Sequence, residues 1–561
     1  MSQAQSTDIA EDVSTPTPVV RDEEWEESSF TFLTVNDLYE ISAVDGWGGF
    51  AELHAVVNEE RERCADKDKP CFFTVNGDFM SASAASIKYK GKHCVSLFNA
   101  MEVDAVVFGN HEFDFGNSIL RDVIAASKFK WFGTNVLQSD SDEVFGNALR
   151  EDIWEAGPLR IGVFGLCTRA VPQLSFPGPD VTFAPVLECA EMAVKRLKAK
   201  GCHYIVCLTH LTYQEDMALA RAVRGIDLIL GGHDHEVFSC TVGNTLILKC
   251  GCDAKYLGRV DVTVRWRTGH PNSQSDIHND SSNHHNTESG LRVVIPRLQL
   301  LPIINIPNPV PETAALVAGF SDVSAEQQAL LCRFSYPIDT SSSLVRSHEC
   351  SFGSFVADAM RATLQADIAI INGGFLRGNR AYPSDNNGCT DFTLADLARE
   401  LPFASPVVLV QMRMREVKQA LDSMLRFLPQ LSGAFPHLSG AISKYDPNAA
   451  PLSRVISLEL TARTQAENNP LVTVAMTEFM HRGGDGCVAL SAGESIPTPE
   501  WEDLPGRIGA DLHGKMHWTV RDCVAALCAT FPVGTLLELP VDDGRRVVNI
   551  AEENLNEAIN A

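Results

Sequence analysis

The 561-residue sequence contains no continuous run of about twenty apolar residues, which is the length that a helix needs to cross a bilayer. The stretch Met1 to Ser29 is acidic and has no apolar core of the kind found in secretory signals. The last residues, with Glu552, Glu553 and Glu557, lack the hydrophobic tail of a GPI signal. These absences predict a cytoplasmic protein that does not act at a membrane.

Positive charge is also scarce in this chain. It has 46 Lys and Arg against 72 Asp and Glu, which gives a formal net charge of -26. Nucleic acids and anionic membranes bind basic faces, so we expect neither as a general partner. A phosphorylated small molecule remains compatible with this charge, because bound metal ions dominate the field around a site.

The 16 cysteines lack the paired spacing of a zinc knuckle. Several lie in apolar, strand-like runs, among them Cys71, Cys167 and Cys207. A buried thiol behaves there as a small apolar side chain. We therefore expect reduced, structural cysteines, as is usual in the cytosol.

The length of the chain predicts more than one domain, and its 45% hydrophobic and 21% charged residues are ordinary for a soluble protein. Strand-like runs alternate with helical patterns such as Leu187 to Lys200 in the first half. The stretch Thr268 to Ser289 is nearly free of apolar residues and predicts a disordered surface insertion. We expect its His residues to be solvated side chains of this loop and not metal ligands. We expect an acidic tail at 1–29, a first domain at 30–307 with an insertion at 268–289, a linker helix at 308–332, a second domain at 333–540 and an acidic tail at 541–561.

In the linker, the segment Glu312 to Leu331 has a helical pattern, and the second domain begins near Arg333. The second domain mixes helical and strand-like patterns. We expect helices at 352–365 and 394–400, and strands at 368–371, 407–410 and 455–460.

Residues of metal-ligand type follow five strand-like runs, namely 30–35, 71–75, 105–108, 204–208 and 228–230. The polar clusters after these runs are Asp37, Gly77-Asp78, Gly109-Asn110-His111-Glu112, Thr209-His210 and Gly232-His233-Asp234-His235. Open α/β folds place their sites at the carboxyl ends of neighbouring strands, so these groups should converge at one rim. Five clusters in this order predict a two-metal hydrolytic site.

The local sequence predicts the direction in which some of these side chains point. Gly77 permits a tight turn in which the carboxylate of Asp78 could bridge two cations. Asp37 and Tyr39 point to the same side if the strand before them continues. His233 and His235 face the same way only if their turn is strand-like.

These clusters resemble the signature of the calcineurin-like metallophosphoesterases. The runs Asn76-Gly-Asp-Phe-Met-Ser-Ala-Ser83 and Gly109-Asn-His-Glu-Phe-Asp-Phe-Gly116 are similar to its 5′-nucleotidase branch in particular. The resemblance covers roughly 30–540 without the insertion. It implies an α/β protein with an N-terminal four-layer αββα metallophosphoesterase domain and a C-terminal α+β domain of 5′-nucleotidase type.

The resemblance also implies two divalent metal ions, drawn from Mn, Zn, Co, Mg and Fe. Asp78 would bridge them; the remaining ligands would be Asp37 and His235 on one ion, and Asn110, His210 and His233 on the other. A metal-bound hydroxide would attack phosphorus in line. His111 would stabilise the developing charge or protonate the leaving oxygen, oriented by Asp114. Glu112 is then a supporting residue and not a ligand.

Tyr39 departs from the family pattern, in which this position is His. One reading is that the phenol is tolerated beside the metals and the first site is weaker. The other is that Tyr39 binds a trivalent iron as phenolate, although a free phenol ionises only near pH 10. A visible charge-transfer band that is lost in Tyr39→Phe would distinguish the second reading.

The second domain carries motifs that resemble the C-terminal domain of 5′-nucleotidases. They are Ile371-Asn-Gly-Gly-Phe-Leu-Arg-Gly378, Leu401-Pro-Phe403, Phe435-Pro-His-Leu-Ser-Gly440, Thr477-Glu-Phe479 and Gly483-Gly-Asp-Gly486. By this resemblance Phe403 and Phe479 sandwich a base. The base and ribose contacts would come from Asn372, Arg377 and Asp485.

Two further features follow from the family pattern. Relatives often carry an Arg at the position nearest His348, whereas Arg346 lies two residues away. Contact of Arg346 with phosphate or ribose is therefore doubtful. Family members also deliver substrate by rotating the C-terminal domain about the linker, which places a hinge within 312–331 here.

These observations predict a two-metal hydrolase of phosphate esters, a 5′-nucleotidase that releases phosphate from small-molecule nucleotides. The same metals would serve a 2′,3′-cyclic-nucleotide phosphodiesterase or a nucleotide-sugar pyrophosphatase. A family member that binds nucleotides without turnover is a third possibility, which the departures at Tyr39 and His348 suggest. The presence of both His111 and Asp114 argues for catalysis.

Overall fold

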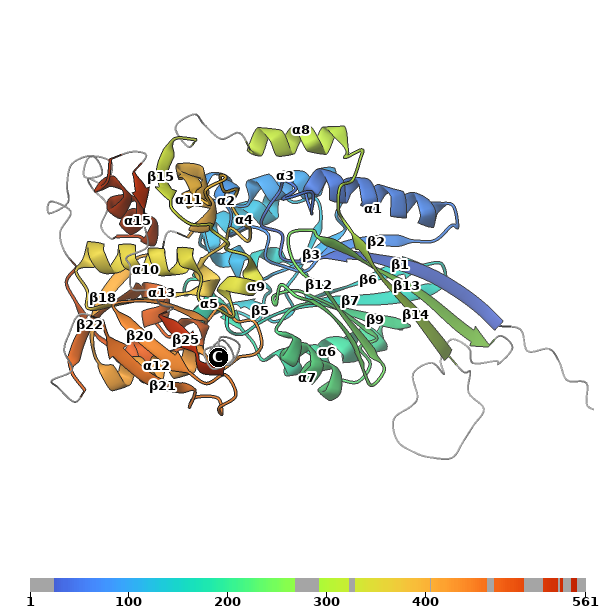
Figure 1. Ribbon diagram of the computed structural model, residues 1–561. Helices are drawn as coiled ribbons and strands as arrows, with labels where there is room; N and C mark the ends of the chain where they lie inside the picture. The colour runs from blue at the N-terminus through green and yellow to red at the C-terminus, as the bar shows by residue number, and fades with distance from the viewer. Residues whose placement is uncertain are drawn as a thin grey trace, which may run out of the picture.

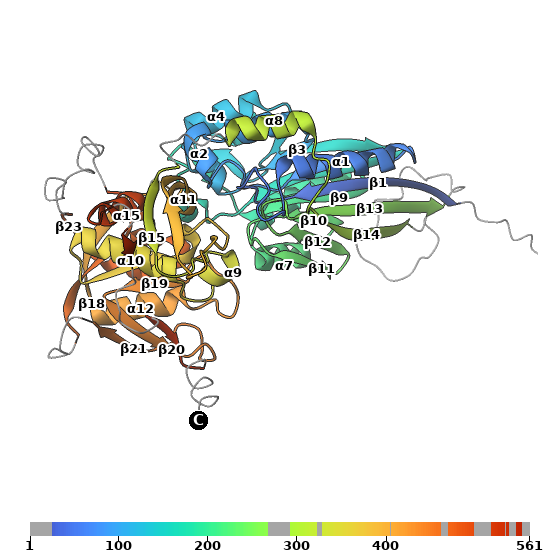
Figure 2. The same ribbon diagram turned by 45° about the horizontal axis from the view of Figure 1, so that its top comes forward.

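The computed structural model describes residues 25–267, 292–321, 328–403, 405–461, 469–498, 518–532, 535–537 and 546–551. The insertion expected at 268–289, with His270, His278, His284 and His285, lies outside the described residues, as does most of the N-terminal acidic segment. The chain forms two lobes, an N-terminal one and a C-terminal one, which Figure 2 separates clearly. No helix among the described residues is long and apolar enough to span a membrane.

Two six-stranded sheets form the centre of the N-terminal domain (Figure 1). The first sheet contains, in spatial order, β14 (Arg292–Pro302), β13 (Tyr256–Arg267), β1 (Trp25–Val35), β2 (Cys71–Val75), β3 (Ala105–Val107) and β4 (Lys130–Phe132). The second contains β11 (Val237–Val242), β12 (Thr245–Cys250), β10 (Leu228–Gly231), β9 (Tyr204–His210), β7 (Leu159–Cys167) and β6 (Glu151–Ala156). The short strands β5 (Val136–Gln138) and β8 (Val181–Phe183) pair beside them.

Successive side chains along each strand point to opposite faces of the sheet, which produces the layers of this domain. In β1, Phe30 and Phe32 lie in the core between the two sheets, whereas Leu33 and Val35 face the helices. The helices over the first sheet are α1 (Phe50–Ala65), α3 (Lys92–Ala100) and α4 (Asn117–Ala126). The second sheet is covered by α6 (Val186–Ala199) and α7 (Tyr213–Ala222). The four-layer αββα architecture is thus confirmed.

The strands and the helix expected in this domain are present, but β1 begins earlier than predicted. Residues 25–29, expected in an acidic tail, belong to β1 and pair with β13 from Trp25 opposite Arg267 onward. Glu27 lies opposite Arg265 and pairs with its guanidinium at 2.8 Å. Hydrogen bonds to a distant strand therefore extend β1 where the local sequence is polar.

The linker helix is shorter than predicted. Helix α8 (Pro311–Phe320) packs on α1, with the His54 ring 2.7 Å from the Thr313 hydroxyl, and lies along the outside of this lobe in Figure 1. Leu330 and Leu331, expected in the helix, instead begin β15 (Leu330–Phe334). The prediction was wrong there because β15 pairs with two strands that are far away in the sequence.

The C-terminal domain is built on a five-stranded sheet of β19 (Pro436–Ser439), β16 (Ile368–Asn372), β22 (Leu471–Thr477), β18 (Val407–Arg413) and β23 (Glu494–Ile496). Two three-stranded sheets flank it, one of β17 (Thr390–Thr393), β15 and β24 (Leu536–Leu537), the other of β21 (Val455–Leu460), β20 (Ala441–Tyr445) and β25 (Val547–Asn549). Its helices include α9 (Ser342–Val345), α10 (Ser351–Leu364), α11 (Leu394–Glu400), α12 (Met414–Met424), α13 (Glu478–His481) and α15 (Val520–Ala529). Alternate residues of β16 enter separate cores, Ala369 and Ile371 on one side and Ile368 and Ile370 on the other.

The tail expected from 541 onward is partly a structural element. Val547–Asn549 form β25, which pairs in parallel with β20. The guanidinium of Arg546 donates to Asp358 of α10 at 2.8 and 2.9 Å. The acidic composition of this segment predicts a tail, and that prediction was wrong for 546–551, where a strand forms.

Candidate metal and active site

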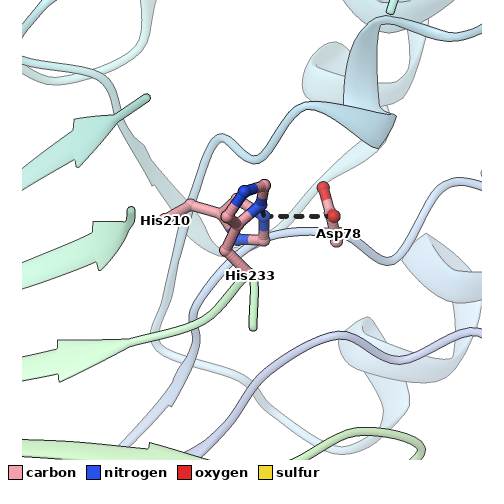
Figure 3. Close-up of side chains that lie close together, drawn as sticks. All are labelled: Asp78, His210 and His233. Atoms are coloured by element: carbon pink, nitrogen blue, oxygen red, sulfur yellow. Dashed lines mark hydrogen bonds and ion pairs between the residues drawn. The ribbon is translucent and has the colours of Figure 1, made fainter. Parts of the chain in front are cut away.

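Five polar clusters meet at one rim of the N-terminal domain, at or just past the carboxyl ends of β1, β2, β3, β9 and β10. Figure 3 shows Asp78, His210 and His233 pointing toward one another from separate segments. The ligand atoms of these three side chains all lie within 4.8 Å of one another. The convergence predicted from strand order is therefore present.

The backbone at this rim is not strand-like. Asp37, Asp78, His233 and His235 have φ values of 54°, 58°, 88° and 61°, in the left-handed region that non-glycine residues rarely adopt. Strands β1 and β10 end before them, so a continuing strand does not align Asp37 with Tyr39. The turns after the strands bring the side chains together instead, held by backbone bonds such as Asp37 N–H to the Gly77 carbonyl at 3.1 Å.

One group of possible metal ligands surrounds the carboxylate of Asp78. The His210 Nε2 atom lies 3.1 Å from Asp78 Oδ2 and 3.3 Å from His233 Nδ1. His210 Nδ1 donates to the Asn76 carbonyl at 2.8 Å, which directs Nε2 toward the other donors. The Asn110 Oδ1 atom is buried and has no hydrogen-bond partner among the described residues. Carboxylate, amide oxygen and two imidazole nitrogens fit a divalent ion.

Strong electrostatic coupling accompanies this convergence. Burial opposes the charge of Asp78, but the His210 and His111 rings beside it outweigh burial and hold the pKa of this carboxyl below its usual range. Burial also opposes protonation of His210, but Asp78 raises the pKa of this ring to about 10. Burial and the neighbouring His210 lower the pKa of His233 to about 3.

A second set of donors surrounds the hydroxyl of Tyr39. The Oη atom lies 3.0 Å from Asp37 Oδ1, 3.2 Å from Asp78 Oδ2 and 2.8 Å from His235 Nε2. His235 Nε2 is itself 3.2 Å from Asp37 Oδ1. Burial, followed by the carboxylates of Asp37 and Asp78, raises the pKa of Tyr39 well above its usual value, so the phenol is neutral.

His111 and Asp114 form a pair beside the donors. His111 Nδ1 lies 2.7 Å from Asp114 Oδ2, and Nε2 lies 4.0 Å from Asp78 Oδ2. Asp114 is held in turn by the Ser175 hydroxyl at 2.5 Å, a contact from a distant loop that the sequence did not predict. Burial opposes protonation of His111, but Asp114 and Asp78 prevail and raise the pKa of the ring.

Glu112 is fully buried, and its carboxylate is taken up by backbone N–H groups. Its carboxylate accepts backbone N–H bonds from Gly109 at 2.6 Å, from Asp78 and Phe79 at 2.9 Å and from Met80 at 3.2 Å. These bonds tie the loop after β2 to the loop after β3. The expectation that Glu112 supports the site without binding metal agrees with these contacts.

A cavity of about 550 Å³ opens between the two domains over this rim. Its walls include Asp78, Asn110, His111, Asp114, His233 and His235 from one domain and all five predicted substrate residues, Asn372, Arg377, Phe403, Phe479 and Asp485, from the other. Such a volume is typical of small-molecule sites. The Phe403 ring stacks on His111 at 5.7 Å and 21°, and Asn372 donates to Asp485 at 2.8 Å.

Two arginines extend the predicted set. The Arg377 guanidinium lies 4.4 Å from the centroid of the Tyr39 ring. Arg346 also lines the cavity, and its Nε atom is buried without a partner among the described residues. The two-residue offset therefore does not remove Arg346 from the site, because the turn after α9 carries it inward. Arg426, which donates to the Asp485 carbonyl at 2.7 Å, had no signal in the sequence.

Comparison with known families matches both domains. Residues 30–237 match the model of the calcineurin-like phosphoesterases, and residues 326–492 match the model of the 5′-nucleotidase C-terminal domain. Together the two matches include every predicted site residue.

Individual proteins are similar over most of the chain. The trifunctional nucleotide phosphoesterase of Bacillus subtilis is 27% identical over 478 residues, which is 76% of this chain but 31% of that protein. This chain thus spans about a third of that relative. The mouse 5′-nucleotidase is 25% identical over 474 residues, 78% of each chain. The crystal structure of a 5′-nucleotidase precursor from Thermus thermophilus shares the fold, with a TM-score of 0.74 at 21% identity over 93% of this chain and 99% of that chain.

Proposed function

Because the chain belongs to the 5′-nucleotidase family of the calcineurin-like phosphoesterases, we propose that it is a metal-dependent hydrolase that releases phosphate from nucleotides. One observation carries the proposal. A single cavity is lined by a converging ligand set, by the His111–Asp114 pair and by aromatic and polar groups of the second domain.

The ligand set of Asp78, Asn110, His210 and His233 would hold a divalent ion. When bound, such an ion lowers the pKa of a coordinated water and withdraws charge from a phosphoryl oxygen. We expected two ions drawn from Mn, Zn, Co, Mg and Fe. The set around Asp78 would hold one of these ions, and Asp37 and His235 are the ligands expected for the other.

The residues of the chain then have separate tasks. His111, protonated and oriented by Asp114, would donate to the phosphoryl or leaving oxygen. Phe403 and Phe479 would hold the base, and the Asn372–Asp485 pair would contact base or ribose. Arg377 and Arg346 would supply positive charge to the phosphate.

A second candidate function is supported by the Bacillus relative, whose name describes a trifunctional nucleotide phosphoesterase. Hydrolysis of 2′,3′-cyclic nucleotides or of nucleotide sugars needs the same metals and base contacts. A protein that binds nucleotides without turnover would not need the His111–Asp114 pair, which is held by a further hydroxyl.

The test is phosphate release from nucleoside mono-, di- and triphosphates, cyclic nucleotides and nucleotide sugars. Metal-stripped protein is reconstituted with each candidate metal, with His111→Ala as the control. We expect metal-dependent release that the variant loses, fastest with a nucleoside monophosphate. Nucleotide binding without release under every metal would overturn the proposal.

A further inference from the structure

We propose that the hydroxyl of Tyr39 takes the place of one of the two metal ions, so that the chain holds a single ion, at the position of His210 and His233. The inference rests on the proposed metal-dependent function and adds a claim about the number of ions. It concerns the donors around Asp37 and His235, which would otherwise bind the second ion.

The Tyr39 hydroxyl occupies the position that the second ion would need. Tyr39 Oη lies between Asp78 on one side and the Asp37–His235 pair on the other, at 2.8 to 3.2 Å from one atom of each. An ion bound to Asp37 and His235 would lie about 2.1 Å from each ligand atom. The phenol oxygen therefore occupies the space that this ion would need, and its single proton can be donated to Asp37 or to Asp78.

The hydrogen bonding of the buried polar atoms differs between the two positions. None of the polar atoms of Asp37, Tyr39 and His235 is among the buried side-chain atoms without a partner. The other carboxylate oxygen of Asp37 accepts from the Asn36 amide at 2.7 Å and from the His233 N–H at 2.8 Å. These groups are complete as hydrogen-bonding partners and need no cation.

The other position is incomplete without an ion. Asn110 Oδ1 has no hydrogen-bond partner within the described part of the chain, and the ring nitrogens of His210 and His233 face each other at 3.3 Å beside Asp78. Buried ligand atoms in this arrangement are stabilised by a cation that all of them can bind. The two positions thus differ in what they require.

Positive charge from the second domain lies close to Tyr39. The Arg377 guanidinium rests 4.4 Å from the Tyr39 ring centroid and 5.7 Å from that of Phe403, and Arg346 lines the same cavity. Two permanent positive charges beside Tyr39 disfavour a second divalent cation there. They also provide the charge for a phosphate that the missing ion would otherwise provide. Arg377 further restrains the ring from swinging out of the position.

The experiment counts ions without using turnover. Metal-stripped protein is loaded with excess Mn²⁺ or Zn²⁺, freed of unbound ion by gel filtration and measured by elemental mass spectrometry. We expect one ion per wild-type chain and two per chain in Tyr39→His. Two ions in the wild-type chain, or an iron-loaded protein whose visible band disappears in Tyr39→Phe, would overturn the inference.

Matched variants keep the test decisive if Tyr39→His does not fold. In the wild-type background, His235→Ala should leave one ion per chain, because His235 binds none, whereas His210→Ala should lose it. A fall from two ions to one in His235→Ala would contradict the proposal. Hydrolysis by a wild-type chain with two ions bound would reject the inference and leave the proposed function standing. A wild-type chain with one ion and no hydrolysis would support the inference and reject the proposed function. A wild-type chain that binds no ion would overturn both.

Discussion

At the level of single residues, the chemistry of the site depends on how the His111 ring is held. Asp114 accepts from one ring nitrogen at 2.7 Å and is fixed by Ser175 at 2.5 Å. The carboxylate therefore both orients the imidazole and raises its pKa against the effect of burial. Asp114 is a positioning residue in this arrangement, and its effect should appear in the pH profile.

Asp114→Asn should lower kcat by about 10- to 100-fold, because it weakens both the orientation and the basicity of His111. Loss of the carboxylate also lowers the pKa of His111, so the alkaline limb of the kcat profile should move to lower pH. Steady-state kinetics from pH 5 to 10 check this; an unchanged alkaline limb would contradict the role of Asp114.

His437 in β19 gives a pH dependence of stability. The ring is fully buried, Nε2 donates to the Val345 carbonyl at 3.1 Å, and Nδ1 has no partner among the described residues. Burial lowers its pKa from 6.5 to about 4. The neutral form is therefore favoured in the folded protein, and its stabilisation is complete above pH 6.5 and is lost as pH falls toward 4.

The free energy of unfolding should accordingly decrease between pH 6.5 and pH 4, by on the order of 3 kcal/mol from this ring alone. His437→Gln keeps an N–H donor but does not titrate, so this part of the pH dependence should disappear. Urea titrations at several pH values measure the difference between the two proteins. Parallel curves for both would show that His437 contributes nothing to acid sensitivity.

The ligand types of the site could be predicted because each follows an apolar strand, and strand ends share a rim. The surroundings of Tyr39 could not, because they depend on the left-handed turn at Asp37 and on Arg377 from another domain. The position of Arg346 in the cavity wall could not be predicted, because distance along the sequence does not give the direction of a turn. Spatial neighbours separated by hundreds of residues leave no local pattern.

At the level of elements, apolar periodicity located strands and helices well in the interior of each domain. α11 and β21 begin and end at the predicted residues. The errors occur at β1, α8 and β25, where pairing with a distant strand decides the structure. Strand pairing is not local, so these ends were beyond reach of the sequence alone.

The terminal strand β25 offers a test of such pairing. Arg546, just before it, forms two hydrogen bonds to Asp358 of α10, and both side chains are nearly buried. Arg546→Ala leaves a buried carboxylate without its partner and should destabilise the C-terminal domain by about 3–5 kcal/mol. Arg415→Ala, at an exposed position of α12, is the matched control and should change the free energy of unfolding by less than about 0.5 kcal/mol. Equal urea midpoints for both variants would mean that β25 does not need this anchor.

At the level of the whole molecule, each domain could be expected from its motifs, but their mutual placement could not. The cavity exists because both lobes contribute walls, and the contacts that close it cross the domain boundary. Phe403 stacks on His111, and the Asn379 amide donates to Asp253 at 3.2 Å. The sequence motifs assign these residues to separate domains and do not predict the contacts between them.

The predicted rotation of the C-terminal domain can be tested by fixing this placement. The Asn379 amide also lies 3.9 Å from the thiol of Cys252 in the other domain, so Asn379→Cys puts two thiols within reach of each other. If substrate exchange requires the domains to separate, oxidation should lower kcat at least about tenfold and a reductant should restore it. The variant Asn379→Cys combined with Cys252→Ala cannot form this bond and should be insensitive to oxidation. Full turnover in the cross-linked protein would mean that nucleotides enter and leave without domain motion, through the open side of the cavity.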